Sequence, residues 1–361
     1  MLSKTSTRRR GFTVLELIVV IGIIAVVIGI IAPAILMVRG AARRAACQGA
    51  LRKLATAMTS RVESHHRFPA VGNIDIADDV QYQSWVTEIL PHLVHDRWPG
   101  GYAFDQPWNA PVNATLVRLS FPELVCPEDP TVMPGQGNLS YVVNCGFAWT
   151  APIDCPATLR STRTSATVIP LDLDGDGIVC PLLPEAGGGR SDLQLMSASS
   201  LFMIEDWPLT SGRERHHRLV GVTDGLTNTL MISENLRAGY DTASDSSWAT
   251  PDVGHVGFVA SSYLCEEGVC AEGKVNYARV NDHSQEPYRY EAINGGLRLP
   301  EGLSPRPSSL HSARVYAAFC DGHVQALSNS IDGRVYAALL TPQGQSLGGP
   351  LAERILNDSD L

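Results

Sequence analysis

The chain lacks the sequence signatures of several enzyme classes: it has no GxSxG elbow, no P-loop, no HExxH motif and no dinucleotide-binding fingerprint. It also lacks CxxC pairs and the Cys and His spacing of zinc fingers, so structural zinc is a poor interpretation. Acidic residues outnumber basic ones, 37 to 28, whereas proteins that bind nucleic acid need a basic surface. We therefore expect a non-enzymatic protein with no catalytic residues and no nucleic-acid partner.

The chain contains eight cysteines, an even number that suits disulfides if most of the chain lies in an oxidising compartment. They are Cys47, Cys126, Cys145, Cys155, Cys180, Cys265, Cys270 and Cys320. The four from Cys126 to Cys180 cluster in the sequence, and Cys265 and Cys270 are near enough to close a small loop. Spacing alone leaves the connectivity open.

A long hydrophobic run extends from Phe12 to Ile35 and contains one charged residue, Glu16. A membrane-spanning helix needs about 20 apolar residues, so this run can cross a bilayer. A cleaved secretory signal would have a shorter apolar region followed by a small-residue cleavage site. A plain anchor would leave Glu16 unexplained, because a carboxylate inside a membrane helix costs about 3 kcal/mol. Three arginines at positions 8–10 precede the run, which keeps the N-terminus cytoplasmic and sends the remainder outward.

The residues around the start of this run, RGFTVLE from Arg10 to Glu16, resemble the class III signal of type IV prepilins and type II secretion pseudopilins. The resemblance implies that prepilin peptidase cleaves after Gly11 and that the new N-terminal residue, Phe12, is methylated. It also implies that Glu16 supports assembly with other pilin-like subunits in the lipid bilayer, by neutralising the Phe12 amine of a neighbour. The alternative is that Glu16 lies near the membrane interface and reaches water, which requires no assembly.

The helix that begins in this run is expected to continue past Pro33, with or without a kink, to about Glu63. Its second half has an apolar face at helical spacing, which should pack on a globular domain: Leu51, Leu54, Ala55, Met58 and Val62. We divide the chain into three parts: a basic leader at residues 1–11, a transmembrane and spine helix at 12–64, and an extracytoplasmic globular domain at 65–361.

The globular part is rich in glycine and proline and in short alternating segments. Segments 314–319 and 323–328 flank Asp321-Gly322, a strong signal for an antiparallel hairpin. A helix is expected at about 332–340, and a strand at 229–233 after a second Asp-Gly turn. The sequence therefore predicts an α+β fold: a long N-terminal membrane-spanning spine helix followed by a β-rich domain of short antiparallel strands.

Two of these segments resemble motifs of a bacterial family known as DUF1559: Val222–Glu234, and His311 together with Ala317–His323. Members typically pair a prepilin-type N-terminus with a domain that has also been described as an extracellular solute-binding domain. Leu226 departs from the family, which usually has Thr there, and residues from about 70 to 220 are unmatched. The polar residues of these motifs are candidates for lining a ligand pocket: Asp224, Asn228, Glu234, His311 and Asp321. Asp-Gly turns offer a simpler role for the two aspartates.

A calcium loop is a further prediction. Asp172, Asp174 and Asp176 alternate as in the first half of an EF-hand loop, and the carbonyl of Ile178 would complete the set. Position twelve is Leu183 instead of the usual acid, so an acidic surface turn is the alternative. The loop would belong to an insertion near residues 150–200, with Ca²⁺ as the only expected cofactor.

Two functional hypotheses follow. The first is a pseudopilin-like structural protein of the bacterial inner membrane, single-pass, with a cytoplasmic N-terminus and a periplasmic or extracellular bulk domain. It would be processed by prepilin peptidase and enter a type II secretion or type IV pilus-like fibre. The second is a membrane-tethered protein that binds a solute or polysaccharide and uses the prepilin signal only for targeting. Removal of the Glu16 carboxylate should prevent assembly under the first hypothesis and change nothing under the second.

Overall fold

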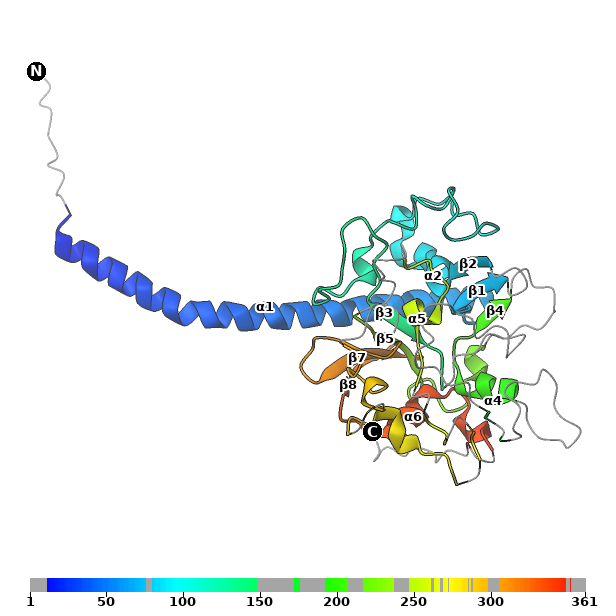
Figure 1. Ribbon diagram of the computed structural model, residues 1–361. Coiled ribbons are helices and arrows are strands. Elements are labelled where there is room, and N and C mark those ends of the chain that lie inside the picture. The colour runs from blue at the N-terminus through cyan, green and yellow to red at the C-terminus, as the bar shows by residue number, and fades with distance from the viewer. Residues whose placement is uncertain are drawn as a thin grey trace, which may run out of the picture. The chain divides into compact units, whose positions relative to one another are not determined.

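The fold was obtained as a computed structural model (Figure 1). It describes residues 12–75, 80–147, 172–173, 175, 192–206, 217–236, 247–260, 263–266, 269–271, 273–284, 286, 288–297, 305–348 and 351. The chain forms two compact units, residues 1–45 and residues 46–361. Helix α1, Val14–His65, begins in the first unit and ends in the second, and it continues through Pro33 as the sequence predicts.

In the first unit, the described side chains from Phe12 to Ile35 are exposed, although almost all of them are apolar. Among the described residues, α1 is a helix long and apolar enough to cross a membrane. A capping box begins it: the backbone N–H of Thr13 donates to the Glu16 carboxylate over 2.9 Å, and the N–H of Glu16 donates to the Thr13 hydroxyl over 3.3 Å. An apolar helix with exposed side chains is expected to be covered by lipid or by other helices.

In the second unit, one face of α1 from Cys47 to Val62 packs into the domain core. The predicted apolar face is confirmed, since Leu51, Leu54 and Met58 are fully buried. The same segment contacts helix α2, Trp85–Val94, through an ion pair between Arg61 and Glu88. Burial of large side chains at helical spacing, together with this partly buried ion pair, fixes this part of α1 in the domain.

The larger sheet has five strands in the order β6-β3-β5-β7-β8. Their bounds are β3 Tyr141–Asn144, β5 Leu230–Glu234, β6 Gly257–Phe258, β7 Arg314–Phe319 and β8 Val324–Ser328. The predicted strand before Glu234 and the predicted hairpin are both confirmed, and Gly322 has a φ of 89° in the hairpin turn. Strands β3 and β5 are buried along their whole length, so they form the centre of the core.

A second sheet has the order β2-β1-β4, with β1 Gly72–Asp75, β2 Val80–Ser84 and β4 Ile204–Asp206. The α+β prediction is confirmed, and the two sheets add two parallel pairs, β1 with β4 and β3 with β6, to the expected antiparallel ones. Among the described residues, the other α-helices are α4 Asp192–Ser199, α5 Val253–Val256 and α6 Gly333–Leu340. The predicted helix α6 is capped by Asp332, whose carboxylate accepts the N–H of Arg334 over 2.8 Å.

Short 3-10 helices are also present among the described residues: η1 His95–Arg97, η2 Pro122–Leu124, η3 Leu219–Gly221, η4 Tyr277–Asn281, η5 Tyr288–Tyr290 and η6 Gly344–Ser346.

Two disulfides lie among the described residues. Cys265–Cys270 closes the small loop expected from the sequence, whereas Cys126 pairs with Cys47 of α1, 79 residues away. Cys145 and Cys320 are buried thiols.

Candidate functional site

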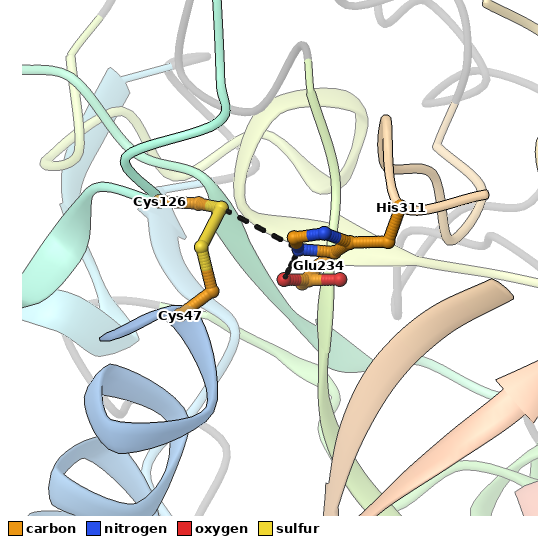
Figure 2. Close-up of side chains that lie close together, drawn as sticks. All are labelled: Cys47, Cys126, Glu234 and His311. Atoms are coloured by element: carbon orange, nitrogen blue, oxygen red, sulfur yellow. Dashed lines mark hydrogen bonds and ion pairs between the residues drawn. A yellow bond between two sulfur atoms is a disulfide. The ribbon is translucent and has the colours of Figure 1, made fainter. Parts of the chain in front are cut away.

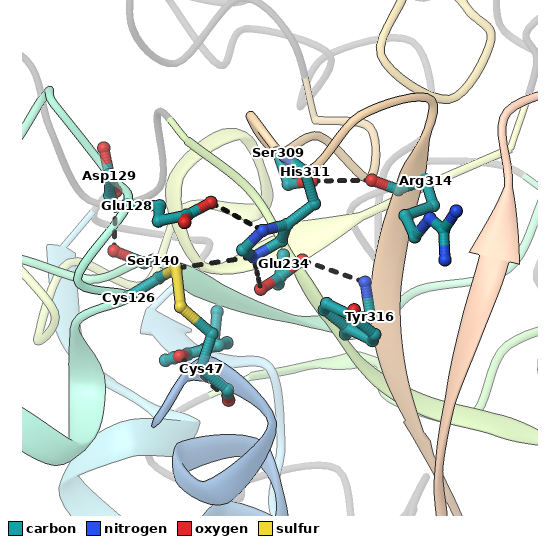
Figure 3. Close-up of a disulfide and its surroundings, with 11 residues drawn as sticks. Cys47, Cys126, Glu128, Asp129, Ser140, Glu234, Ser309, His311, Arg314 and Tyr316 are labelled. Atoms are coloured by element: carbon teal, nitrogen blue, oxygen red, sulfur yellow. Dashed lines mark hydrogen bonds and ion pairs between the residues drawn. A yellow bond between two sulfur atoms is a disulfide. The ribbon is translucent and has the colours of Figure 1, made fainter. Parts of the chain in front are cut away.

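Within the part of the chain that the structure describes, a group of titratable and metal-binding side chains surrounds His311, which lies between two carboxylates and beside a disulfide (Figures 2 and 3). Its Nε2 atom is 3.1 Å from Oε1 of Glu234, and its Nδ1 atom is 2.7 Å from Oε2 of Glu128. The Sγ atom of Cys126, bonded to Cys47, lies 3.8 Å from Nε2. His311 and Glu234 are each only 2% exposed, so this is a buried charged cluster and not an open pocket.

A tight turn before β7 sets the position of His311. The backbone N–H of His311 donates to the Ser309 hydroxyl over 3.1 Å, and that hydroxyl donates to the Arg314 carbonyl over 2.7 Å. The N–H of Arg314 donates in turn to the His311 carbonyl over 3.0 Å. Ala313 has a φ of 55°, a left-handed conformation that this closed turn requires. The ring is therefore held by backbone geometry as well as by its carboxylate partners.

Glu234 is held from the neighbouring strand. It is the last residue of β5, and its Oε2 atom accepts the backbone N–H of Tyr316 in β7 over 2.8 Å. Its two carboxylate oxygens thus have separate partners, one a strand N–H and the other the His311 ring. A buried carboxylate is tolerated where it is paired and hydrogen-bonded in this way.

A third acid, Asp129, lies nearby and is buried. Its carboxylate accepts the hydroxyls of Ser140 over 2.6 Å and Thr131 over 2.5 Å, and the N–H of Thr131 over 2.8 Å. Burial nevertheless raises the pKa of Asp129, with a contribution from the charge of Glu234, because these hydrogen bonds only partly offset desolvation. The Asp129 carboxyl therefore stays protonated to a higher pH than an aspartate side chain in water does.

The charge of His311 follows from two opposing effects. Burial alone would lower the pKa of His311, but the hydrogen bond and charge of Glu234, assisted by Glu128, outweigh it and raise the pKa. The imidazolium form is thereby favoured in the disulfide-bonded protein, because it has an anion next to each ring nitrogen.

The five polar residues predicted to line a pocket fall into two groups at opposite ends of β5. Glu234 and His311 form the cluster described above. At the other end, the carboxylate of Asp224 accepts the N–H of Gly344 over 2.5 Å, and the amide of Asn228 donates to the Asp224 carbonyl over 3.4 Å. Asp321 lies next to this turn and accepts from His323, both from its N–H over 3.0 Å and from its ring over 2.6 Å.

The remaining predicted sites lie outside the domain cluster or outside the described residues. Phe12 is 80% exposed, and Glu16 is at the start of α1, whereas Gly11 is not among the described residues. Of the calcium-loop residues, Asp174, Asp176 and Ile178 also lie outside them. Asp172 is described and buried, and its carboxylate accepts the N–H of Gly175 over 2.7 Å. Calcium binding stays a prediction.

No sequence motif marks Glu128, Cys47 or Cys126 as neighbours of His311. No local pattern connects Cys47 with Cys126, since 79 residues separate them. Glu128 follows Cys126 by two residues, so the disulfide that places Cys126 beside His311 also places Glu128 there. One donor atom from each of Cys47, Cys126, Glu234 and His311 lies within 4.8 Å of the others. These donors are of the types that bind transition metals, although sulfurs joined in a disulfide are not available as thiolates.

Comparisons with known proteins match the chain to two families. Residues 6–32 match the prokaryotic N-terminal methylation motif, which implies processing by prepilin peptidase. Residues 37–334 match a family described as a protein of unknown function, DUF1559. Neither a curated protein nor a solved structure matches the chain. The motif and the apolar helix indicate membrane anchoring with an extracytoplasmic domain. With most of its length matched, the chain belongs to the DUF1559 family and carries a prepilin-type N-terminus.

Proposed function

We propose that this protein is a pseudopilin-like structural subunit without enzymatic activity. It would be cleaved between Gly11 and Phe12 and would enter a type II secretion or type IV pilus-like fibre through packing of its N-terminal helix. The observation that carries the proposal is the methylation motif at residues 6–32, which leads directly into a helix whose apolar side chains are exposed. Such a surface is stabilised by lipid before assembly and by neighbouring helices after it.

The proposed membrane topology follows from the positive charge before the apolar run. Three arginines at positions 8–10 favour a cytoplasmic N-terminus in the bacterial inner membrane, which would send the domain from residue 46 onward to the periplasm or the exterior. Disulfides such as Cys47–Cys126 support this orientation, because they persist in oxidising compartments.

Glu16 can act in two ways that differ in their need for charge. Within the single chain, its carboxylate accepts the backbone N–H of Thr13 over 2.9 Å and so caps helix α1. In a fibre, it would pair with the methylated Phe12 amine of a neighbouring subunit, which is cationic. Capping needs only a hydrogen-bond acceptor, whereas pairing across subunits needs the negative charge.

Two substitutions separate these roles. Glu16→Gln keeps an acceptor suited to the capping box but removes the charge, and Glu16→Ala removes both. We expect intact mass to show removal of residues 1–11 and addition of one methyl group in the wild type and in both variants. Both variants should be absent from sheared or crosslinked fibre fractions. Fibres of Glu16→Gln at the wild-type level would contradict charge pairing, and an uncut leader in the wild type would contradict the proposed processing.

The alternative, a tethered protein that binds a solute or polysaccharide, has less support. It needs an accessible site, but Glu234 and His311 are each 2% exposed, and Asp224 and Asp321 serve turns at the other end of β5. We therefore favour the structural function.

A further inference from the structure

The buried cluster combines two sulfurs, an imidazole and a carboxylate that originate from four distant parts of the sequence. Cys47 comes from α1, Cys126 from the segment after η2, Glu234 from the end of β5 and His311 from the turn before β7. Their donor atoms lie within 4.8 Å of one another, and all four residues are buried (Figure 2). Cys, His and acidic side chains are all zinc ligands, and four of them are the number that a tetrahedral zinc site needs.

We propose that Cys47, Cys126, Glu234 and His311 bind one Zn²⁺ when the Cys47–Cys126 disulfide is reduced. The site would hold either the metal ion or the disulfide, but not both at once. A newly exported chain carries both cysteines as thiols, and the ion would occupy the site until the disulfide closes. This inference concerns the domain alone and is independent of fibre assembly.

The distances agree with a tetrahedral centre. With Zn–S bonds of about 2.3 Å and Zn–N and Zn–O bonds of about 2.0–2.1 Å, neighbouring S and N ligands are about 3.6 Å apart and N and O ligands about 3.3 Å. The observed separations are 3.8 Å from Cys126 Sγ to His311 Nε2 and 3.1 Å from Nε2 to Glu234 Oε1. The two sulfurs would have to separate from bonding distance to about 3.8 Å.

The surroundings of two ligands already have the form expected around a bound metal. A histidine that binds zinc usually donates its other ring N–H to a carboxylate, and Glu128 lies 2.7 Å from Nδ1 of His311 (Figure 3). The carboxylate of Glu234 is oriented by the N–H of Tyr316 at 2.8 Å on the oxygen away from the ring. Nε2 of His311 thus already lies next to both a sulfur and Oε1 of Glu234, as binding of a shared metal ion requires.

The exchange between the two states balances. Zinc binding releases the thiol protons of Cys47 and Cys126, and the proton on Nε2 of His311 when the ring is charged. In the reverse direction, a small disulfide such as oxidised glutathione takes two electrons from the two thiolates. The products are the Cys47–Cys126 disulfide, free Zn²⁺ and two molecules of reduced glutathione, and the glutathione thiols take up two protons from solvent.

The test uses the full chain in detergent, reduced with a phosphine and kept free of oxygen, with Co²⁺ as the optical probe and Zn²⁺ as its competitor. We expect one equivalent of Co²⁺ to give the thiolate charge-transfer and visible bands of a tetrahedral site, which one equivalent of Zn²⁺ abolishes. Oxidised glutathione should release the metal, and the unreduced protein should show no bands. Absence of bands at one equivalent in the reduced wild type would overturn the proposal.

Variants locate the metal among the eight cysteines. Cys47→Ala/Cys126→Ala should abolish the bands, whereas the matched control Cys265→Ala/Cys270→Ala should keep them; the reverse result would assign the metal to other thiols and overturn the proposal. Glu128→Gln retains every ligand, and the dichroism spectrum should verify its fold. The Glu128→Gln substitution should weaken Zn²⁺ affinity about 10–100-fold, because His311 loses the carboxylate beside its other ring nitrogen. Unchanged affinity in this variant would contradict a site that uses His311.

Discussion

Nε2 of His311 lies 3.1 Å from the carboxylate of Glu234, and the two residues are 77 positions apart in the chain. This contact connects the turn before β7 to the end of β5 and occurs where the Cys47–Cys126 disulfide joins α1 to the domain. The cluster therefore holds together four segments that no local sequence pattern would bring into contact.

Replacing His311 should destabilise the domain. In His311→Gln, Glu234 and Glu128 lose a cationic partner in a buried site, and breaking such a pair costs about 3 kcal/mol. Urea unfolding of the oxidised protein would measure the change. The control is His323→Gln, which removes an exposed partner of Asp321 and should shift the free energy of unfolding by less than about 0.5 kcal/mol. Equal effects in the two variants would count against an energetic role for the cluster.

The stability of the oxidised domain should depend on pH above about 6.5. The pKa of His311 is raised in the folded protein, so between the unfolded value near 6.5 and the higher folded value the native state binds more protons. The free energy of unfolding therefore falls as pH rises through this window, and the contribution is fully present below it. Urea titrations at pH values on both sides should show this slope in wild type, and His311→Gln should lack it. A wild-type curve parallel to that of the variant would refute the assignment.

The two disulfides should differ in their effect on stability. Loop closure across 79 residues corresponds to about 4.5 kcal/mol of chain entropy, whereas closure across 5 residues corresponds to about 2 kcal/mol. Cys47→Ala/Cys126→Ala should therefore lower the free energy of unfolding more than Cys265→Ala/Cys270→Ala, as judged by urea midpoints without metal. The opposite order would show that the long bridge is dispensable for folding.

Cys145 and Cys320 should resist alkylation in the folded protein. Burial raises the pKa of both thiols, with a smaller effect of Asp321 on Cys320, so neither thiolate is populated near pH 7. Mass spectrometry after iodoacetamide treatment should find both modified only after unfolding in denaturant. Stoichiometric labelling of either thiol in native protein would indicate that its segment opens readily.

Calcium binding is a prediction from the sequence alone. Titration calorimetry should detect heat from Ca²⁺ in wild type and none in Asp174→Ala, because the loop carboxylates supply the hard oxygen ligands. Asp321→Asn, in the hairpin turn, serves as the control and should bind as wild type does. The calcium loop would be ruled out by a wild-type titration without heat.

Much of the architecture could be predicted because its signals are local. The apolar run from Phe12 to Ile35, the Asp321-Gly322 hairpin and the helix after Asp332 each depend on residues within a few positions of one another. The antiparallel pairing of β7 with β8 follows from the turn, whereas the parallel pairing of β3 with β6 joins strands more than 100 residues apart and has no local signal. The absence of zinc-finger spacing argues against a zinc finger, because finger ligands lie close together in the sequence. It does not argue against a zinc site assembled from four separate segments.

By itself, the sequence determined the prepilin-type N-terminus, its long helix and the Asp-Gly turns, because hydrophobic periodicity and turn chemistry act over short distances. Tertiary structure alone decided that Cys47 pairs with Cys126 and that His311 lies between Glu128 and Glu234. The hydroxyl of Tyr141, in β3, donates to the carbonyl of Cys47 over 3.3 Å, so α1 contacts the larger sheet beside these residues. Contacts across such sequence separations depend on which surfaces become buried together, and spacing along the chain does not encode that choice.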